Sequence, residues 1–189
     1  IVPSVLTELL QKKGILEHDI ADVINTITYP DEHTPLFSSR LDLLKIGKAR
    51  QAGVKKDKID TMLSSWLQNY GYIPVNFCED PWIRKDAERQ LKEITKEDCK
   101  QEIFRLKKEH TKKLKDKAKQ LSLINTPKVT IFANAVAEGT YLNELRKNIF
   151  SKVSLKIRKV FSDIALLGGS QNWRDVYYLT SDEICLLIN

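Results

Sequence analysis

Hydrophobic residues recur with the period of an α-helix along most of this chain. The clearest pattern begins at Ile59 and ends at Tyr70, with apolar residues at i, i+3, i+4, i+7, i+8 and i+11. Because this spacing puts them on one face, it predicts an amphipathic helix from Asp57 to Tyr70. The same period predicts shorter helices over residues 4–13, 19–28, 38–52 and 84–94.

Turn residues stand where these predicted helices end. Gly14, Gly53 and Gly71 each follow the last apolar residue of a pattern, which is the position that glycine favours after a helix. Pro30 ends the second helix, because the residue before a proline is forced out of the helical region. Ser38 or Ser39 is the expected N-cap of the third helix.

Two long helices are predicted in the second half of the chain. Thr95-Lys-Glu-Asp98 resembles a capping box and would start a helix to Leu123, and Thr126-Pro127 would start another that continues for about 40 residues to Leu167. The first helix has a narrow apolar stripe among many charges, which is typical of a coiled-coil seam. We therefore expect the two helices to pair as an antiparallel arm. The apolar positions of the second are Phe132, Val136, Leu142, Leu145, Ile149, Val153, Ile157, Val160, Ile164 and Leu167.

Three stretches depart from this regular pattern. Tyr72–Ile83 is aromatic, holds two prolines and has no helical period, so it is expected to be a loop packed against the domain. Val176–Leu179 is expected to be extended, and Thr180-Ser-Asp-Glu183 is a capping box that starts a last helix. Gly139 is expected to mark a bend or a close helix crossing.

Composition supports an all-α protein of 189 residues. Only seven glycines and six prolines occur, with 42% hydrophobic and 30% charged residues. We predict one helical domain, with a lobe of short helices over 1–94 and the long arm with its C-terminal cap over 95–189. No apolar run reaches the roughly 20 residues that a membrane span needs.

The formal charge of +6 permits anionic partners without choosing among them. Lysines concentrate between Arg105 and Lys119, where three interpretations stay open: a solvated arm, a surface for a partner or for phosphates, and a nucleic-acid surface. No aromatic residue lies among these lysines to stack on bases, so nucleic acid is the least favoured partner.

No catalytic, cofactor-binding or metal-binding residues are predicted. His18, His33 and His110 fall on three different elements and are interpreted as surface or helix-end residues. Gly168-Gly169-Ser170 is interpreted as a helix end, and the pairs Glu79-Asp80 and Asp182-Glu183 as a loop and a helix start. The three cysteines are far apart and form no C-x-x-C motif, which indicates a reducing, cytoplasmic environment.

Three segments resemble the phosphoenolpyruvate-utilising phosphotransferases, a family that includes phosphoenolpyruvate synthase relatives and rifampicin phosphotransferases. Asp175-Val-Tyr-Tyr-Leu-Thr-Ser-Asp-Glu-Ile is similar to the segment that precedes the swivelling phosphohistidine domain in that family. Asn69-Tyr-Gly-Tyr, followed by Pro81-Trp82, resembles a second segment. Ser39-Arg40, with Asp42-Leu-Leu-Lys-Ile after it, resembles a third, and the three occur in the family's order.

This resemblance implies a helical connecting region between a nucleotide-binding domain and the swivelling domain. The catalytic Thr-Ser-His segment of the family has no counterpart here, so the chain is expected to be a fragment that is not catalytic alone. ATP and Mg²⁺ would then serve the parent enzyme, and the partners would be other domains of the same polypeptide. A free-standing helical interaction module is the alternative, with a nucleic-acid binder less favoured.

Overall fold

The computed structural model describes residues 2–77, 80–170 and 172–188, and within these ranges the chain is helical, with no β-strand. The predicted all-α fold is therefore confirmed. The elements in chain order are α1 (Val2–Gln11), α2 (Glu17–Ile27), α3 (Pro35–Gln51), α4 (Lys56–Tyr70), the 3-10 helix η1 (Ile73–Phe77), α5 (Arg84–Ile94), α6 (Cys99–Ile124), α7 (Pro127–Leu167), the 3-10 helix η2 (Trp173–Tyr178) and α8 (Ser181–Ile188).

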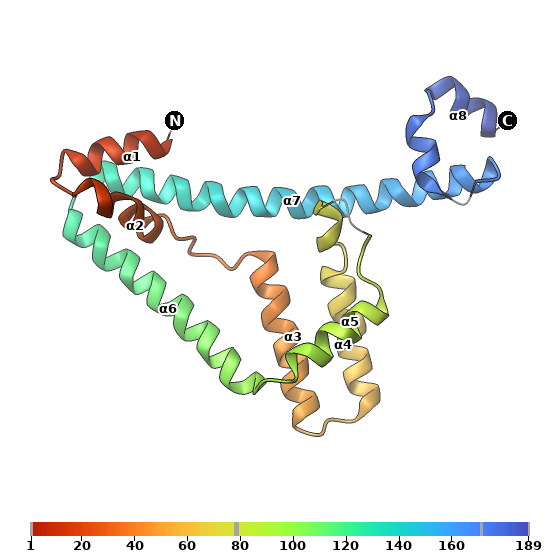
Figure 1. Cartoon of the computed structure of the whole chain (residues 1–189), viewed down its shortest axis with the longest axis horizontal. Helices are drawn as coiled ribbons and strands as arrows, with labels where there is room; N and C mark the ends of the chain where they lie inside the picture. The colour runs from red at the N-terminus through yellow and green to blue at the C-terminus, as the bar shows by residue number, and fades with distance from the viewer. Residues whose placement is uncertain (1, 78–79, 171, 189) are drawn as a thin grey trace.

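The helices form an open triangular frame (Figure 1). α7 is one side and extends along the whole molecule, and α6 leaves its N-terminal end at an angle. The third side is formed by α3, α4 and α5, of which α3 contacts α6, while η1, which follows α4, reaches α7. The long helix is therefore held at both ends and near its middle, and much of its length borders solvent.

The first corner of the triangle is a small hydrophobic core. α1 and α2 pack there on the end of α6 and the start of α7. Asn125 adopts the left-handed conformation (φ 44°) that reverses the chain between the two long helices, a conformation that asparagine tolerates better than most residues. The buried residues of this corner are Leu6, Leu10, Ile20, Ile27, Ile124, Val129 and Ala133.

The second core lies where α3, α4 and α5 meet. The indole Nε1 of Trp66 donates a hydrogen bond to the carbonyl of Ser39 (2.9 Å), and its ring stacks on Trp82 with centroids 5.3 Å apart. The Tyr70 hydroxyl donates to Asp42 (2.7 Å). The polar atoms of both aromatic side chains are therefore hydrogen-bonded where the rings pack. The buried residues are Leu43, Ile46, Ile59, Leu63, Trp66, Ala87 and Leu91.

The predicted antiparallel arm of two paired helices is wrong. α6 packs mainly against α2 and α3 and meets α7 only around the Asn125 turn, beyond which the two helices diverge (Figure 1). The apolar stripe of α6 is used by other partners, since Leu106 packs with Leu44 and Cys99 while Leu121 joins the first corner.

Two predicted helix starts are also corrected. α3 begins at Pro35, and its N-cap is Thr34, whose hydroxyl accepts from the amide of Phe37 (3.3 Å), so neither Ser38 nor Ser39 is the cap. α6 is capped by Asp98, whose carboxylate accepts from two backbone amides. Thr95 instead ends α5, and its hydroxyl donates to the carbonyl of Leu91 (2.9 Å).

The segments predicted to be irregular have mixed outcomes. Tyr72, Ile73 and Val75 are buried where η1 meets α7, so the expected packed loop is confirmed, although part of it is a 3-10 helix. Val176 belongs to η2 and is not extended as predicted. The capping box at Thr180 is confirmed, since its amide donates to the Glu183 carboxylate and its hydroxyl accepts from the Glu183 amide.

Candidate interaction surface

A stripe of large apolar side chains on α7 faces solvent. Ile149, Val153 and Val160 are 55%, 47% and 55% exposed. Positions 149, 153, 157, 160, 164 and 167 follow the 3.6-residue period, so their side chains share one face over about 27 Å of helix. We call this the outer stripe, and its members are Leu142, Ile149, Val153, Ile157, Val160, Ile164 and Leu167.

The opposite face of α7 explains why the stripe is turned outward. Apart from Val129 near the start of the helix, its buried positions carry small side chains, at Ala133, Ala137, Ser151 and Ala165. Small residues let the backbones of α1, η1 and η2 approach closely, and these elements contact α7. Phe132 and Val136 still pack on the first corner. From Leu142 onward, however, the buried positions of α7 are Ser151 and Ala165, and most large apolar residues of the predicted pattern remain outside.

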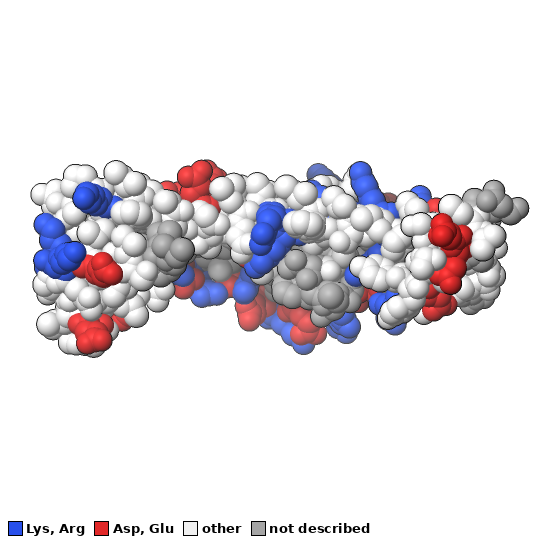
Figure 2. All heavy atoms as spheres, turned by 90° about the horizontal axis from the view of Figure 1, so that it is seen from above, with Lys and Arg blue, Asp and Glu red and all other residues white. Residues whose placement is uncertain are grey.

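Positive charge borders the outer stripe. Between Leu142 and Leu167 the helix carries six Lys or Arg residues and two acidic residues. One acid, Glu144, pairs with Lys147 at 2.7 Å, which leaves Asp163 as the other carboxylate of this segment. Figure 2 looks down on α7, and the face is largely white, with separate blue and red side chains on it. The exposed cations are Arg146, Lys152, Lys156 and Lys159.

An aromatic pocket lies at the C-terminal end of this surface. It has a volume of about 390 Å³ and is formed between α7, η1 and η2. The guanidinium carbons of Arg158 and Arg174 lie 4.9 and 4.8 Å from the centroid of the Trp173 ring. The Tyr177 ring meets Phe161 edge-on at 5.7 Å. The pocket thus combines two cations with several aromatic faces.

A second aromatic cluster lies where the connector between α2 and α3 crosses α6. The rings of His33 and His110 are 4.4 Å apart, and the Tyr29 hydroxyl lies 3.0 Å from Nδ1 of His110. Burial, His33 and Lys113 lower the pKa of His110, while Asp31 acts in the opposite direction. Sequence reasoning missed this pair, because nothing in the pattern links residues 77 positions apart.

The predicted surface or helix-end position is confirmed for His18 and His33, whereas His110 lies in the middle of α6. His18 and His33 are exposed and His110 is half-buried on α6. In the described part of the chain, no three His, Cys, Asp or Glu side chains are grouped to hold a metal ion. No helix among the described residues is both long and apolar enough to cross a bilayer.

The Lys-rich helix α6 divides into a solvated face and a packed face. Lys112, Lys115 and Lys119 are exposed, whereas Lys117 is buried and donates to the carbonyl of Tyr29 and to Asp31, both at 3.0 Å. Lys117 therefore anchors the connector between α2 and α3. The exposed lysines are compatible with a solvated face or an anionic partner.

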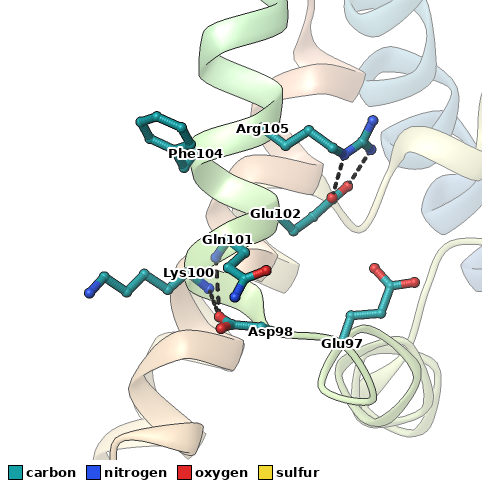
Figure 3. Close-up of a pocket in the computed structure, with 7 residues that line it drawn as sticks. All are labelled: Glu97, Asp98, Lys100, Gln101, Glu102, Phe104 and Arg105. Atoms are coloured by element: carbon teal, nitrogen blue, oxygen red, sulfur yellow. Dashed lines mark hydrogen bonds and ion pairs between the residues drawn. The ribbon is translucent and has the colours of Figure 1, made fainter.

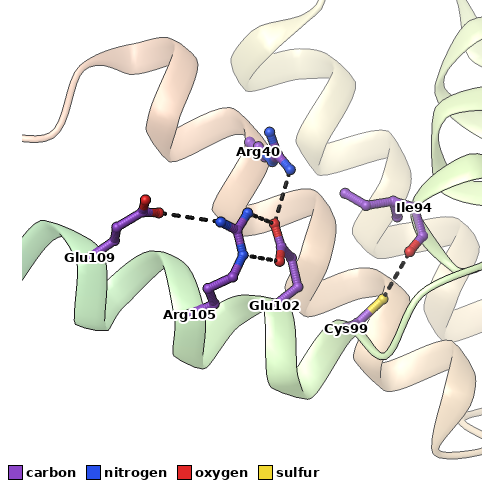
Figure 4. A network of polar contacts seen from close by, with 6 residues as sticks. All are labelled: Arg40, Ile94, Cys99, Glu102, Arg105 and Glu109. Carbon is purple, nitrogen blue, oxygen red and sulfur yellow. Dashed lines mark hydrogen bonds and ion pairs between the residues drawn. The ribbon is translucent and has the colours of Figure 1, made fainter.

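The start of α6 carries a surface hollow and an ion-pair network. The hollow is lined by Glu97, Asp98, Phe104 and their neighbours. Figure 3 shows the Phe104 and Lys100 side chains projecting away from the helix, whereas Asp98 faces the backbone of the first turn. Glu102 accepts two bonds from Arg105 (2.7 Å each) and one from Arg40 (3.0 Å), which join α6 to α3 (Figure 4). These guanidiniums, Arg105 first, lower the pKa of Glu102. This network fixes a helix crossing.

The glycine and acidic pairs interpreted from the sequence as helix ends and loops have structural roles where the structure describes them. Gly169 has φ 78° and ends α7, as expected of a glycine after a helix. Asp182 and Glu183 lie in the first turn of α8. In the pair Glu79-Asp80, Glu79 lies outside the described residues, and Asp80 lies near Arg158 and Arg174. Gly139 has no atom within 4 Å of an added Cβ, so it marks no close crossing.

No family model, curated protein or solved structure matches the chain. The resemblance to the phosphoenolpyruvate-utilising phosphotransferases therefore stays a prediction from the three sequence segments.

Proposed function

We propose that this chain is a helical connecting module that holds another protein domain along the outer stripe of α7. The observation that carries the proposal is the exposure of this stripe over more than 20 residues of one straight helix face. Contiguous exposed apolar surface of this kind marks an interaction site in a soluble protein. The triangular frame would keep the surface straight and would fix the distance between what binds at its two ends.

Charge favours an occupant with acidic residues around an apolar face. A second copy of the chain would bring Lys152, Lys156 and Lys159 close to the same cations, which is unfavourable. An acidic partner surface would pair with them while covering the apolar stripe. The overall charge of +6 has the same sign as the stripe's border and adds to this preference.

Within this proposal, the occupant is another domain of a phosphoenolpyruvate synthase-like phosphotransferase. Support comes from the three ordered segments, whose residues make structural contacts in the fold. Asp42 accepts from Tyr70 and from Lys45, Trp82 stacks on Trp66, and Thr180 caps α8. ATP and Mg²⁺ would be bound by other domains of such a parent.

The parent coding sequence tests the family part of the proposal. We expect a nucleotide-binding domain before these residues and a Thr-Ser-His segment after them. A coding sequence that ends near Asn189 without that segment would overturn the connecting role in a phosphotransferase. The docking role would then stand alone, as a free-standing interaction module.

Photo-crosslinking tests the docking part. A benzophenone amino acid at Val153 or Val160, in the cells that naturally make the protein, is expected to link to one discrete protein or to one domain of the same polypeptide. Lys107 on the exposed face of α6 is the matched control position. Equal adducts at Lys107, or no discrete adduct at Val153 and Val160, would contradict docking on the stripe.

A further inference from the structure

We propose that the exposed face of α6 binds a membrane surface through anionic lipid headgroups. This inference goes beyond the proposed function and does not depend on docking along the outer stripe of α7. The face consists of exposed side chains spaced three or four residues apart, so they lie on one side of the helix over about 29 Å. We call it the lysine face, and its members are Phe104, Lys108, Lys112, Lys115, Lys119 and Leu123.

The fold turns the lysine face away from the rest of the molecule. The buried residues of α6 include Leu106 and Lys117, which stand two positions after Phe104 and Lys115 and therefore about 200° around the helix from them. Through its buried side α6 packs on α2 and α3. α6 forms one outer edge of the triangular frame, and no other described helix lies beyond this edge in Figure 1. A flat surface can therefore meet the lysine face along its length.

The positive charge of this face is not neutralised within the described part of the chain. None of its four lysines takes part in an ion pair with a described residue, whereas three lysines elsewhere each pair with an acid three residues away. Between Phe104 and Leu123 the helix exposes six lysines and two acids, Glu109 and Asp116. Glu109 is paired with Arg105 at 3.4 Å. The face thus keeps an excess of positive charge that an anionic partner would offset.

Lysine side chains suit a surface made of many headgroups. The ammonium group is a compact charge on a flexible stem, so it needs no fixed geometry from its partner. Each lysine close to an anionic membrane strengthens binding about five-fold. The lysine face holds no arginine, whose planar group favours paired hydrogen bonds to a fixed phosphate or base. Its composition therefore favours electrostatic attraction to a fluid anionic surface.

Two large apolar side chains stand at the ends of the lysine face. Phe104 is 67% exposed and Leu123 is 70% exposed, and both would gain free energy by leaving water. On a membrane they would enter the boundary between headgroups and acyl chains while the lysines bind the headgroups, as in helices that lie on membrane surfaces. A nucleic-acid duplex would pair with the lysines alone and leave both apolar side chains in water. This difference favours lipid as the partner.

Co-sedimentation of the whole chain with lipid vesicles tests the proposal. We expect the protein to bind vesicles of phosphatidylcholine that contain about 30% phosphatidylserine, and to stay in solution with phosphatidylcholine alone. Raising the salt concentration from about 0.1 M to about 0.5 M should release the bound protein, because salt screens the attraction.

Two sets of four glutamine substitutions locate the charge that matters. Replacing the four lysines of the lysine face should weaken binding to the phosphatidylserine vesicles by about 100-fold or more. The matched control replaces four exposed cations of α7 and should weaken binding by no more than about five-fold. Each set lowers the net charge by four, from +6 to +2, so only the position of the charges differs. The control residues are Arg146, Lys152, Lys156 and Lys159.

A second pair of variants tests the apolar ends of the face. Phe104→Gln with Leu123→Gln removes two exposed apolar side chains, and glutamine is a good helix former. We expect this double variant to bind phosphatidylserine vesicles about ten-fold more weakly. Ile83→Gln with Leu166→Gln, at residues outside α6 that are 61% and 66% exposed, is the matched control and should bind like the wild type.

Several results would overturn the assignment. These are failure to bind phosphatidylserine vesicles at about 0.1 M salt, equal binding to neutral vesicles, and equal losses in the two sets of four substitutions. A short DNA duplex is the competing probe. If the wild type binds the duplex more tightly than the vesicles, and Phe104→Gln with Leu123→Gln leaves duplex binding unchanged, the lysine face serves nucleic acid and the lipid proposal is wrong.

Discussion

α4 and the second half of α7 have the same hydrophobic period and opposite surroundings. On α4, Leu63 and Trp66 are 1% and 3% exposed, because α3 and α5 cover that face. On α7, Ile149 and Val153 are likewise about one helical turn apart, and they are about half exposed. A helical period shows which residues share a face. It does not show whether the chain itself supplies the partner for that face.

The largest difference between the two helices should appear on truncation of one side chain in each. Leu63→Ala removes a fully buried side chain and is expected to lower the free energy of unfolding by about 2–5 kcal/mol. Ile149→Ala removes an exposed side chain and should change it by no more than about 0.5 kcal/mol. Urea denaturation followed by circular dichroism measures both. Similar losses for the two variants would mean that the outer stripe is buried in solution.

The sequence was sufficient for most of the helices and insufficient for their partners. Gly14 and Gly53 end helices as expected, and both have φ near +77°, a conformation that glycine adopts without strain. The pairing of α6 with α7 was predicted from a narrow stripe that could equally face α2 and α3. Nothing in the pattern distinguishes these partners, because the choice depends on contacts far apart in the sequence.

The same reason accounts for what was missed near the candidate sites. The apolar residues of the outer stripe were recognised and assigned to a seam with α6, since the small residues at Ala133, Ala137 and Ser151 were not interpreted as part of the buried face. Those residues were a usable signal. The Arg158–Trp173 contact had no comparable signal, because it depends on how η2 folds back on α7.

A smaller loss of stability than that of Leu63→Ala is expected from a substitution where α3 crosses α6. A Cβ on Gly47 would lie 2.6 Å from Sγ of Cys99, which is buried. Gly47→Ala should therefore lower the free energy of unfolding by about 1–3 kcal/mol through overpacking. Adding Cys99→Ala should recover part of this loss in a double-mutant cycle, because the smaller side chain makes room.

Gly139 on α7 is the matched control for this substitution. It lies in a helix, and no atom lies within 4 Å of an added Cβ. Gly139→Ala is expected to stabilise the protein by about 0.5–1 kcal/mol, because alanine loses less backbone freedom in a helix. If Gly139→Ala lowers the stability, another element or a second copy packs on α7 at that position in solution. If Gly47→Ala leaves the stability unchanged, the tight α3–α6 crossing is contradicted.

Acid should lower the free energy of unfolding through His110, where the connector between α2 and α3 crosses α6. Burial, His33 and Lys113 lower its folded-state pKa, although Asp31 opposes them and Tyr29 shares a hydrogen bond with the ring. The unfolded chain, with an ordinary histidine pKa near 6.5, then binds a proton at higher pH than the folded chain does. The resulting stability is present above that pH and is lost as pH falls through the folded-state pKa.

The free energy of unfolding at pH 7.5 and 5.5 measures this contribution. His110→Gln should reduce the difference between the two pH values, whereas His18→Gln, at an exposed histidine, should leave it unchanged. An equal reduction by both substitutions would assign the pH dependence to histidines in general. The contact between His33 and His110 would then have no separate role in holding the connector to α6.

The smallest effect on stability is expected on the outer stripe itself. Val153→Ser with Val160→Ser removes apolar surface at two exposed positions, and serine and valine have similar helix propensities. The free energy of unfolding should change by no more than about 0.5 kcal/mol per site, and binding of an apolar fluorescent dye should fall. If the double variant is less stable than the wild type only when both are measured at high protein concentration, a second copy covers the stripe. If it is equally stable at every concentration, the stripe is kept apolar for a partner outside this chain, because its residues then add nothing measurable to folding.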